Sequence, residues 1–209
     1  MAQENPWLAR PDRNGDAYDE PYERRAAAGE NVHGEADFIT RIGARSVLDA
    51  GCGTGRIARE LARRGLDVVG VDLDDAMLDT ARRKAPEMEW HTADLATVDL
   101  GRTFAAILMA GNVMIFLTPG SEGAVLANMG RHLEPGGALV AGFQLRPGGL
   151  TLERFDALAA AAGLPLKDRY ATWDEDPVVE GGGYAVSVLR KPADHRNQSR
   201  VRKDAEPQR

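Results

Sequence analysis

Three glycines at alternate positions, Gly51, Gly53 and Gly55, form the segment of this chain with the clearest chemical meaning. They follow the apolar run 46–50 and precede a stretch with helical periodicity. Because glycine has no Cβ atom, it lets the backbone come close to a ligand, and the N–H groups that open a helix attract polar ligand atoms. The loop therefore predicts a small-molecule site at the end of a strand.

Two acids beyond the loop indicate a ligand with a nucleoside part. Asp72 ends the apolar run 66–71, and Asp94 follows the next strand-like run. A carboxylate in the position of Asp72 can accept both hydroxyl hydrogens of a ribose, and one in the position of Asp94 can accept from an exocyclic amine such as adenine N6. Tight packing of a strand against a helix would explain the glycines but not these two acids.

The charge beside the loop bears on the class of ligand. Residues 53–58 come close to the G-x-G-x-x-G/A pattern of dinucleotide-binding folds. However, residues 1–45 precede the strand, and the carboxylate of Asp49 is unfavourable beside an anionic pyrophosphate. Asp49 is better matched to a ligand that carries positive charge. An NAD-dependent oxidoreductase stays open as an alternative.

The elements that position these residues alternate between strand and helix patterns. Apolar runs predict five strands, near residues 46–50, 66–71, 88–91, 104–110 and 138–143. Helices are expected between them, with Asp74, Ser121 and Thr151 placed as caps. Two last strands, about 167–173 and 184–190, have no helix between them and predict an antiparallel hairpin. The order predicts an α/β fold: a doubly wound, mostly parallel, seven-stranded sheet with this hairpin at one edge.

Length and composition predict one domain with two flanking segments. For the 209 residues we predict an N-terminal cap segment over 1–33, a ligand-binding domain over 34–191 and a disordered tail over 192–209. The tail has almost no apolar side chains, so it cannot offset the entropy of ordering. Within the cap segment, residues 1–17 are rich in Pro, Asp, Asn and Gly and are expected to be loose or folded over a larger body.

Composition also excludes several classes of protein. The single cysteine, Cys52, cannot form an internal disulfide, which excludes a disulfide-stapled secreted scaffold and favours a reducing compartment. The net charge of −6 gives no general attraction to nucleic acid or anionic lipid. The chain start lacks the pattern of a secretory signal, and no apolar stretch is long enough to cross a membrane. We expect a cytoplasmic protein without nucleic-acid or membrane partners.

Taken together, these motifs resemble the class I S-adenosylmethionine-dependent methyltransferases. Residues 49–55 resemble that family's first motif, and residues 69–72 its second-strand acid. Residues 93–95 are similar to its adenine-contacting segment, and residues 132–137 to the turn before its fifth strand. The resemblance covers about residues 35–191. Further details, at residues 34–36 and 110–114, are similar to a group of small actinobacterial-type members.

The resemblance implies a Rossmann-like methyltransferase fold, S-adenosylmethionine as the cofactor, and in-line methyl transfer to a small-molecule acceptor. It implies that Gly51 and Gly53 line the methionine part of the cofactor, that Asp72 holds the ribose, and that Ala110 faces the sulfonium. It further implies that Leu73, Asp94 and Leu95 contact the adenine. The predicted cofactor-binding residues are Asp49, Gly51, Gly53, Gly55, Asp72, Leu73, Asp94, Leu95 and Ala110.

One residue departs from the family pattern. Many relatives carry Asp after the Phe that opens the fourth strand, whereas here Phe104 is followed by Ala105. That position is usually distant from the methyl group, so we expect an effect on stability rather than on cofactor binding. If the position orients the loop at 111–112, activity would suffer. A non-catalytic cofactor-binding module is therefore a further alternative.

No pattern identifies a catalytic residue, the acceptor or the oligomeric state. The loop 110–113 lacks both the Asn-Pro-Pro-aromatic tetrapeptide of amino-nucleobase methyltransferases and a Pro-Cys nucleophile. Cys52 is interpreted as a small filler within the cofactor loop. His33 is a candidate base, although a structural role is favoured, and structural roles are also expected for His91 and His132.

Four other side chains are candidates for contacts at the site. Tyr18 and Tyr22, four residues apart on an expected helix, either share a face over the site or pack that helix onto the sheet. Asn112 and Met114 either contact the methyl donor or acceptor or shape the loop. No histidine pair, HExxH motif or cysteine cluster has the spacing of metal ligands, so no metal is predicted.

Overall fold

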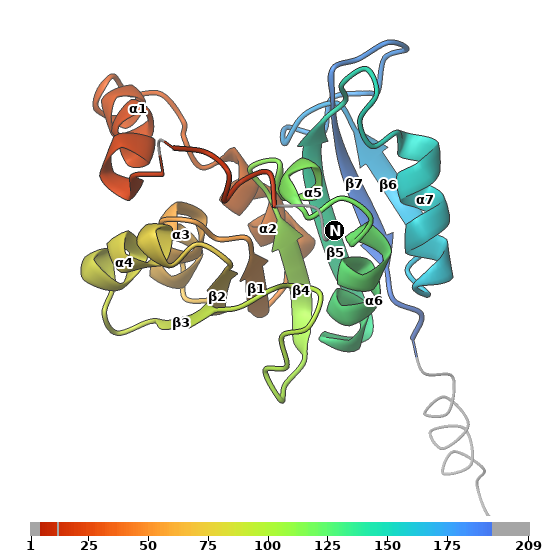
Figure 1. Cartoon of the computed structure of the whole chain (residues 1–209), viewed down its shortest axis with the longest axis horizontal. Coiled ribbons are helices and arrows are strands. Elements are labelled where there is room, and N and C mark those ends of the chain that lie inside the picture. Colours follow the sequence, from red (N-terminus) through yellow and green to blue (C-terminus); the bar gives the residue numbers. More distant parts are fainter. Residues whose placement is uncertain (1–4, 12, 194–209) are drawn as a thin grey trace, which may run out of the picture.

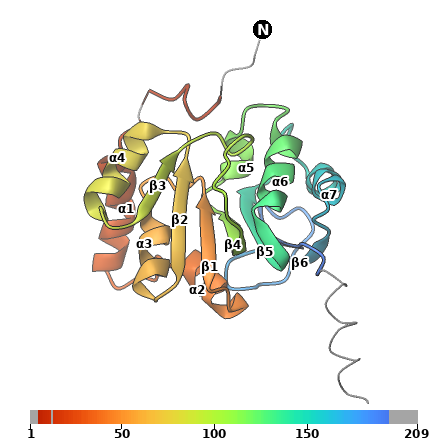
Figure 2. The ribbon, with the colours of Figure 1, turned by 90° about the horizontal axis from the view of Figure 1, so that it is seen from below.

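The computed structural model describes residues 5–11 and 13–193, and most of the predicted disordered tail lies outside these ranges. Within them a seven-stranded sheet runs through the molecule with helices on both of its faces (Figures 1 and 2). The strands are β1 (Ser46–Ala50), β2 (Asp67–Asp72), β3 (Glu89–Thr92), β4 (Phe104–Met109), β5 (Leu133–Gln144), β6 (Leu166–Tyr170) and β7 (Tyr184–Arg190). The helices are α1 (Gly15–Ala27), α2 (Gly34–Ile42), α3 (Arg56–Arg63), α4 (Asp75–Lys84), α5 (Val113–Phe116), α6 (Glu122–Arg131) and α7 (Leu152–Ala161).

The order of the strands in the sheet is β3-β2-β1-β4-β5-β7-β6. Strands β1 to β5 pair in parallel, and β7 pairs antiparallel with both β5 and β6. This confirms the predicted doubly wound sheet with its C-terminal hairpin at one edge. The carboxyl ends of the parallel strands share one edge, where ligands bind in such sheets.

Side chains of β4 alternate between two cores, one on each face of the sheet. Ala106 and Leu108 join the core that includes α2 and α3, whereas Ile107 and Met109 join the core that includes α6 and α7. All four side chains are fully buried. A strand covered on both faces is apolar along its whole length, and this explains the continuous apolar run in the sequence.

All three residues predicted as caps occupy N-cap positions, and two of them make the capping hydrogen bond. Asp74 accepts a hydrogen bond from Ala76 N at 3.0 Å, and Thr151 accepts one from Arg154 N at 3.2 Å. The side chain of Ser121 does not cap α6, because its hydroxyl donates to the carbonyl of Thr118 at 2.7 Å. The hydroxyl thus stabilises the turn before the helix.

Other local features were not anticipated. Helices α2 and α5 were not predicted, and β5 begins at Leu133 rather than at Ala138. Residues 134–137 form an irregularity in its pairing with β4, between the partners of Phe104 and Ala106. Ala105, at this irregularity, donates its N–H to Ser46 Oγ at 2.9 Å. The boundaries predicted after residues 33 and 191 stay predictions.

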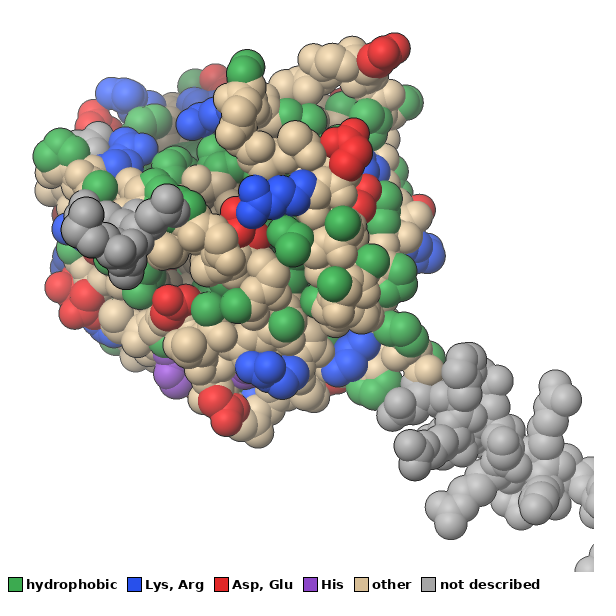
Figure 3. Space-filling model, turned by 45° about the vertical axis from the view of Figure 1, so that its right-hand side comes forward, with side chains coloured by type: hydrophobic (Ala, Val, Ile, Leu, Met, Phe, Trp, Pro, Cys, Tyr) green, Lys and Arg blue, Asp and Glu red, His purple; other side chains and the backbone are tan. Residues whose placement is uncertain are grey.

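Two general features of the described chain bear on its partners. Among residues 5–11 and 13–193, none of the helices combines the length and the apolar character needed to span a membrane. On the face that Figure 3 shows, basic and acidic side chains are interspersed rather than gathered by sign.

Candidate functional site

The glycine loop and Asp72 form one hydrogen-bonded unit at the carboxyl ends of β1 and β2. The N–H groups of Gly51 and Cys52 both donate to the carbonyl of Val71, at 2.7 and 3.0 Å. Gly53 N donates to Asp72 Oδ2 at 2.7 Å, and Asp74 N donates to Asp72 Oδ1 at 2.8 Å. The side chain of Asp72 is thereby fixed against the loop before any ligand is considered.

Two of the loop glycines are required by close packing as well as by their backbone conformation. Gly51, Gly53 and Gly55 have φ values of +84°, +55° and +72°, in the left-handed region that favours glycine. A Cβ atom on Gly51 would collide with Val113, and one on Gly55 would collide with Trp90. At Gly53, by contrast, a Cβ would meet only ordinary van der Waals contact.

A cavity with an empty volume of about 980 Å³, its open mouth included, lies where these strands end. We call it the cofactor cavity. Eight of the nine predicted cofactor-binding residues line it: Asp49, Gly51, Gly53, Asp72, Leu73, Asp94, Leu95 and Ala110. The ninth, Gly55, is not among the lining residues and instead precedes α3 and packs against Trp90.

Asp49 is a buried carboxylate with an unused oxygen in the wall of this cavity. The residue is 2% exposed, and its Oδ2 has no hydrogen-bond partner among the described residues. Burial raises the pKa of Asp49 to about 7; Arg56 opposes this rise, and the charge of Asp72 adds to it. An unpaired buried carboxylate is costly, so the position favours a ligand that brings hydrogen-bond donors and positive charge.

The two later acids keep acceptor capacity toward the cavity. Burial raises the pKa of Asp72, while the backbone N–H groups of Asp74 and Gly53 act against the rise. Each Asp72 oxygen accepts one of these N–H groups, which leaves further lone pairs for ligand hydroxyls. Asp94 is exposed, and its Oδ1 accepts a hydrogen bond from Ala96 N at 2.8 Å, so Asp94 Oδ2 keeps its acceptor capacity.

Arg56, the first residue of α3, carries the one positive charge among the described residues that line the cofactor cavity. Its guanidinium lies over the ring of Tyr22, 4.1 Å from the centroid, and pairs with Glu35 at 2.9 Å. It also donates to the carbonyl of Val32. These contacts join α1, α2 and α3 beside Asp49.

The N-terminal segment and α1 form one side of the cavity. Residues 5–11 thus fold over a larger body, which was one of the two conformations expected for the N-terminal segment. Asn5, Trp7 and Tyr18 are lining residues. Trp7 Nε1 donates to Asp74 Oδ2 at 2.8 Å, and its ring lies 5.3 Å from that of Phe116. Sequence reasoning missed Asn5, Trp7 and Phe116, because no local pattern connects them to the glycine loop.

Tyr18 places a phenol at the end of β4. A Cβ atom on Gly111 would lie 3.8 Å from the Tyr18 hydroxyl, so the phenol faces this residue. Although 37% of Tyr18 is exposed overall, desolvation raises the pKa of its phenol well above the ordinary value, and Tyr22 adds to the rise. The phenol therefore stays protonated at neutral pH and acts as a hydrogen-bond donor rather than as a base.

The other candidates lie in different surroundings. Asn112, at φ +69°, accepts a hydrogen bond from Gln144 N at 2.8 Å, and Met114 is 2% exposed in the core; neither lines the cofactor cavity. His91 lies 2.6 Å from Glu89 on β3.

His132 bridges Asn128 O and Leu100 N at 3.0 and 3.2 Å, and is thus fixed within the fold. His33 lines a separate cavity between α1 and α3. Cys52 does line the cofactor cavity, and burial raises the pKa of its thiol. Across residues 5–11 and 13–193, no three His, Cys, Asp or Glu side chains are grouped so that they could hold a metal ion.

Comparison with known proteins assigns the family. Residues 47–137 match the family described as "Methyltransferase domain". The solved structure of a TehB-like SAM-dependent methyltransferase from Corynebacterium glutamicum is similar, with a TM-score of 0.77 and 38% sequence identity. The alignment covers 85% of this chain and 97% of that one. The chain belongs to the S-adenosylmethionine-dependent methyltransferases. This confirms the family and the fold predicted from the motifs.

Curated members of this methyltransferase family match over shorter stretches. A dTDP-3-amino-3,4,6-trideoxy-alpha-D-glucopyranose N,N-dimethyltransferase of Streptomyces venezuelae is 37% identical over 98 residues, 46% of this chain and 41% of that protein. A dTDP-4-amino-2,3,4,6-tetradeoxy-D-glucose N,N-dimethyltransferase of Saccharopolyspora spinosa is 34% identical over 131 residues, 61% of this chain and 53% of that protein. The chain thus matches about half the length of these curated relatives.

Proposed function

We propose that this methyltransferase binds S-adenosylmethionine in the cofactor cavity and transfers its methyl group to a small-molecule acceptor. The observation that carries the proposal is the gathering of Asp49, Asp72 and Asp94 with the glycine loop in the wall of one cavity. The membership of the family supports methyl transfer over the NAD-dependent alternative.

The chemistry of the wall fits the methionine part of the cofactor near Asp49. An ammonium group there would satisfy the Oδ2 atom that has no partner among the described residues, and its charge would favour the ionised carboxylate. Val113 packs directly against Gly51, where a Cβ atom would collide with it, and both residues line this part of the cavity. A pyrophosphate would instead meet Asp49 and Asp72 with Arg56 as the single compensating cation among the described lining residues.

The nucleoside part fits the second half of the wall. Asp72 retains acceptor sites for the two ribose hydroxyls, and the half-buried Leu73 beside it offers an apolar surface to adenine. Asp94 and Leu95 continue this wall and supply one acceptor and one apolar contact. These acceptors and apolar surfaces support the proposal that the nucleoside part lies here.

The chain's own residues position the acceptor and exclude water. When bound, the cofactor supplies an electrophilic methyl carbon on its sulfonium. Trp7, Phe116 and Leu117 add apolar surface to the wall of the cavity, which lowers the local dielectric. Tyr18 offers a protonated hydroxyl opposite Gly111, where it can donate a hydrogen bond to an acceptor atom and fix its direction.

The acceptor belongs to small-molecule chemistry in this proposal. The two curated relatives are named for N,N-dimethylation of dTDP-amino sugars, so an amine of a small metabolite is among the acceptors to test first.

The absence of any pair of cysteines supports a reducing compartment such as the cytoplasm.

Calorimetry tests the proposal directly. S-adenosylhomocysteine and S-adenosylmethionine should bind in the micromolar range, and Asp72→Ala should abolish the binding. NADH is the competing probe: binding of NADH without binding of S-adenosylmethionine would refute the proposal. Formation of S-adenosylhomocysteine with a panel of amines and alcohols then separates an enzyme from a module that only binds the cofactor.

A further inference from the structure

A second cavity adjoins the cofactor cavity on the side of α1. It is lined by the N-terminal segment, by α1 and by Met77 of α4. Three arginines, Arg10, Arg13 and Arg25, are among its lining residues, and we call it the arginine cavity. Neither the family assignment nor the cofactor requires it.

The two cavities share part of their walls. Trp7, Tyr18 and Met77 line both of them. The Tyr18 hydroxyl faces Gly111 at the end of β4, where the proposed reaction takes place. The arginine cavity and the cofactor cavity therefore meet at these three side chains.

The two cavities differ in charge. The described residues that line the arginine cavity include the three arginines and no Asp or Glu. The cofactor cavity has three aspartates and one arginine in its lining. The lining of the arginine cavity thus differs in sign from the chain as a whole, whose net charge is −6. The acidic cavity suits a cofactor with positive charge, and the basic one suits an anion.

Existing contacts orient Arg13 and Arg25 without using all of their donors. Arg13 Nη1 lies 3.1 Å from Asp74 Oδ1, and Arg13 Nε donates to the carbonyl of Arg10 at 3.2 Å. Arg25 Nε donates to Glu30 at 2.7 Å. A guanidinium carries five N–H donors in a fixed plane, so Arg13 and Arg25 each keep donors for a carboxylate or a phosphate.

Aromatic rings form another part of the wall of this cavity. The ring of Trp7 meets that of Tyr18 edge to face, with centroids 6.2 Å apart, and Tyr18 lies 5.9 Å from Tyr22. The guanidinium of Arg10 lies over Trp7, 5.2 Å from the ring centroid. Aromatic faces beside guanidinium groups recognise flat apolar rings that bear an anionic group.

We propose that the arginine cavity binds the methyl acceptor through an anionic group, a carboxylate or a phosphate on an aromatic or similarly flat ring. The inference rests on the proposed methyl transfer and names its acceptor class. In this arrangement Arg13 and Arg25 hold the anionic end, and the acceptor extends past the shared side chains so that Tyr18 meets the end that is methylated.

Matched pairs of small probes test the charge requirement. Benzoate is compared with benzamide, and phenyl phosphate with phenol, by saturation-transfer NMR titration of the protein saturated with S-adenosylhomocysteine. Each anion should bind about fivefold more tightly than its neutral partner, and added salt should reduce the difference. Preference for benzoate or for phenyl phosphate identifies the carboxylate or the phosphate class. Equal binding within both pairs overturns the proposal.

Arginine variants then locate the site. Arg25→Gln should remove most of the anion preference. Arg24→Gln is the matched control, because Arg24 is the next residue on α1 and pairs with Glu20 but does not line the cavity. An equal loss in the control overturns the proposal.

The affinity for S-adenosylhomocysteine should stay unchanged in both variants, so a failure of the proposed function can be distinguished from a failure of this inference. If the native protein does not bind S-adenosylhomocysteine, the proposed function fails. The same probe titrations without cofactor still decide the charge requirement.

Discussion

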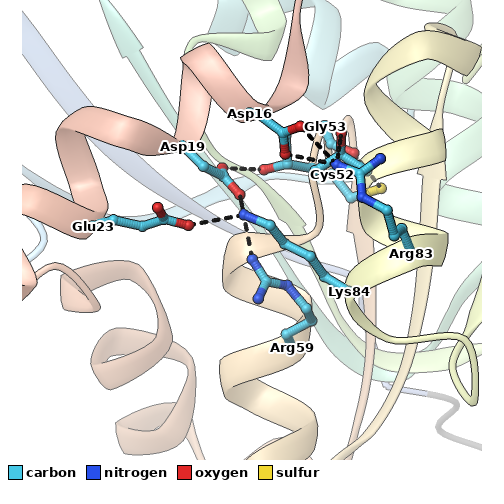
Figure 4. Close-up of polar contacts among 10 residues, drawn as sticks. Asp16, Asp19, Glu23, Cys52, Gly53, Arg59, Arg83 and Lys84 are labelled. Carbon is cyan, nitrogen blue, oxygen red and sulfur yellow. Dashed lines mark hydrogen bonds and ion pairs between the residues drawn. The ribbon is translucent and has the colours of Figure 1, made fainter.

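Asp19 on α1 accepts a hydrogen bond from the hydroxyl of Thr54, within the glycine loop, at 2.5 Å. Asp19 is 2% exposed and Thr54 is 1% exposed. The other Asp19 oxygen lies 2.6 Å from Lys84 Nζ and 3.5 Å from Arg59 (Figure 4). Because Tyr18 is the neighbour of Asp19, the same helix that contacts the cofactor loop also places the phenol in the cavity.

Replacement of the buried acid should loosen this attachment. Asp19→Asn keeps the size of the side chain but removes the charge that faces Lys84 and Arg59. We expect the free energy of unfolding in urea to fall by about 2–3 kcal/mol, less than for a fully buried pair because the two cations are partly exposed.

A second acid on the same helix is the control for that experiment. Asp16 pairs with Arg83 at 2.6 Å, but both side chains are more than half exposed. Asp16→Asn should therefore change the free energy of unfolding by less than about 1 kcal/mol. Equal effects of the two substitutions would contradict the assignment of Asp19 as the anchor of α1.

The raised pKa of Asp49 predicts how ligand affinity depends on pH. Its value of about 7 means that the free protein holds a proton that a cationic ligand displaces. Affinity for S-adenosylhomocysteine should rise by about tenfold from pH 6 to pH 8, because only the ionised form pairs with the ammonium group. Asp49→Asn should bind weakly at both values, and the change between them should be much smaller. Arg56 lowers the pKa of Asp49, whereas Asp72 and Glu35 raise it, so Asp49→Asn is the variant that removes the titration of Asp49 and keeps these neighbours.

The same group affects the stability of the protein without ligand. Because the folded state binds the proton of Asp49 more tightly than the unfolded state does, the contribution is most favourable at low pH. It declines as the pH rises from about 4 to about 7 and is constant above that. In Asp49→Asn this part of the decline in urea denaturation midpoints should disappear. A native slope that persists in the variant would contradict the assignment.

Substitutions at two glycines with nearly equal φ angles distinguish the cost of backbone strain from the cost of a steric collision. Gly51 has φ +84° and Gly29 has φ +82°, but a Cβ atom would collide with Val113 at Gly51 and would meet open space at Gly29. Gly29→Ala should cost about 1 kcal/mol of stability with no change in S-adenosylhomocysteine affinity. Gly51→Ala should cost more and weaken the affinity by more than about tenfold, as calorimetry would report, because Val113 must move from the cavity wall.

The parts of the site that follow from the sequence are those encoded by short segments. The glycine loop lies next to Asp72 because parallel β1 and β2 end together, so both residues could be named from local patterns. Trp7 could not, because it contacts Asp74 across 67 positions of the chain and its own segment is polar.

Other local features depend on the folded conformation of the chain and could not be predicted from residue types. Ser121 is a suitable helix cap by residue type, yet its hydroxyl donates to the carbonyl of Thr118 instead. The four residues of α5, Val113–Phe116, are too few to show a helical period. Their position above Gly51 nevertheless shapes the cavity.

A substitution of Tyr18 distinguishes a role in positioning the acceptor from a role as the general base. Tyr18→Phe removes the hydroxyl that faces Gly111 and leaves the ring contacts with Trp7 and Tyr22 in place. S-adenosylhomocysteine affinity should stay within about twofold, while kcat/KM for the acceptor should fall by about tenfold through the lost hydrogen bond. The pH profile between 6 and 9 should keep its shape, because a phenol with a raised pKa does not titrate there. If Tyr18 were the base, activity would rise with pH across this range, and Tyr18→Phe would abolish that rise. Tyr22→Phe is the control, because it changes the neighbouring ring of the pair and keeps the Tyr18 hydroxyl.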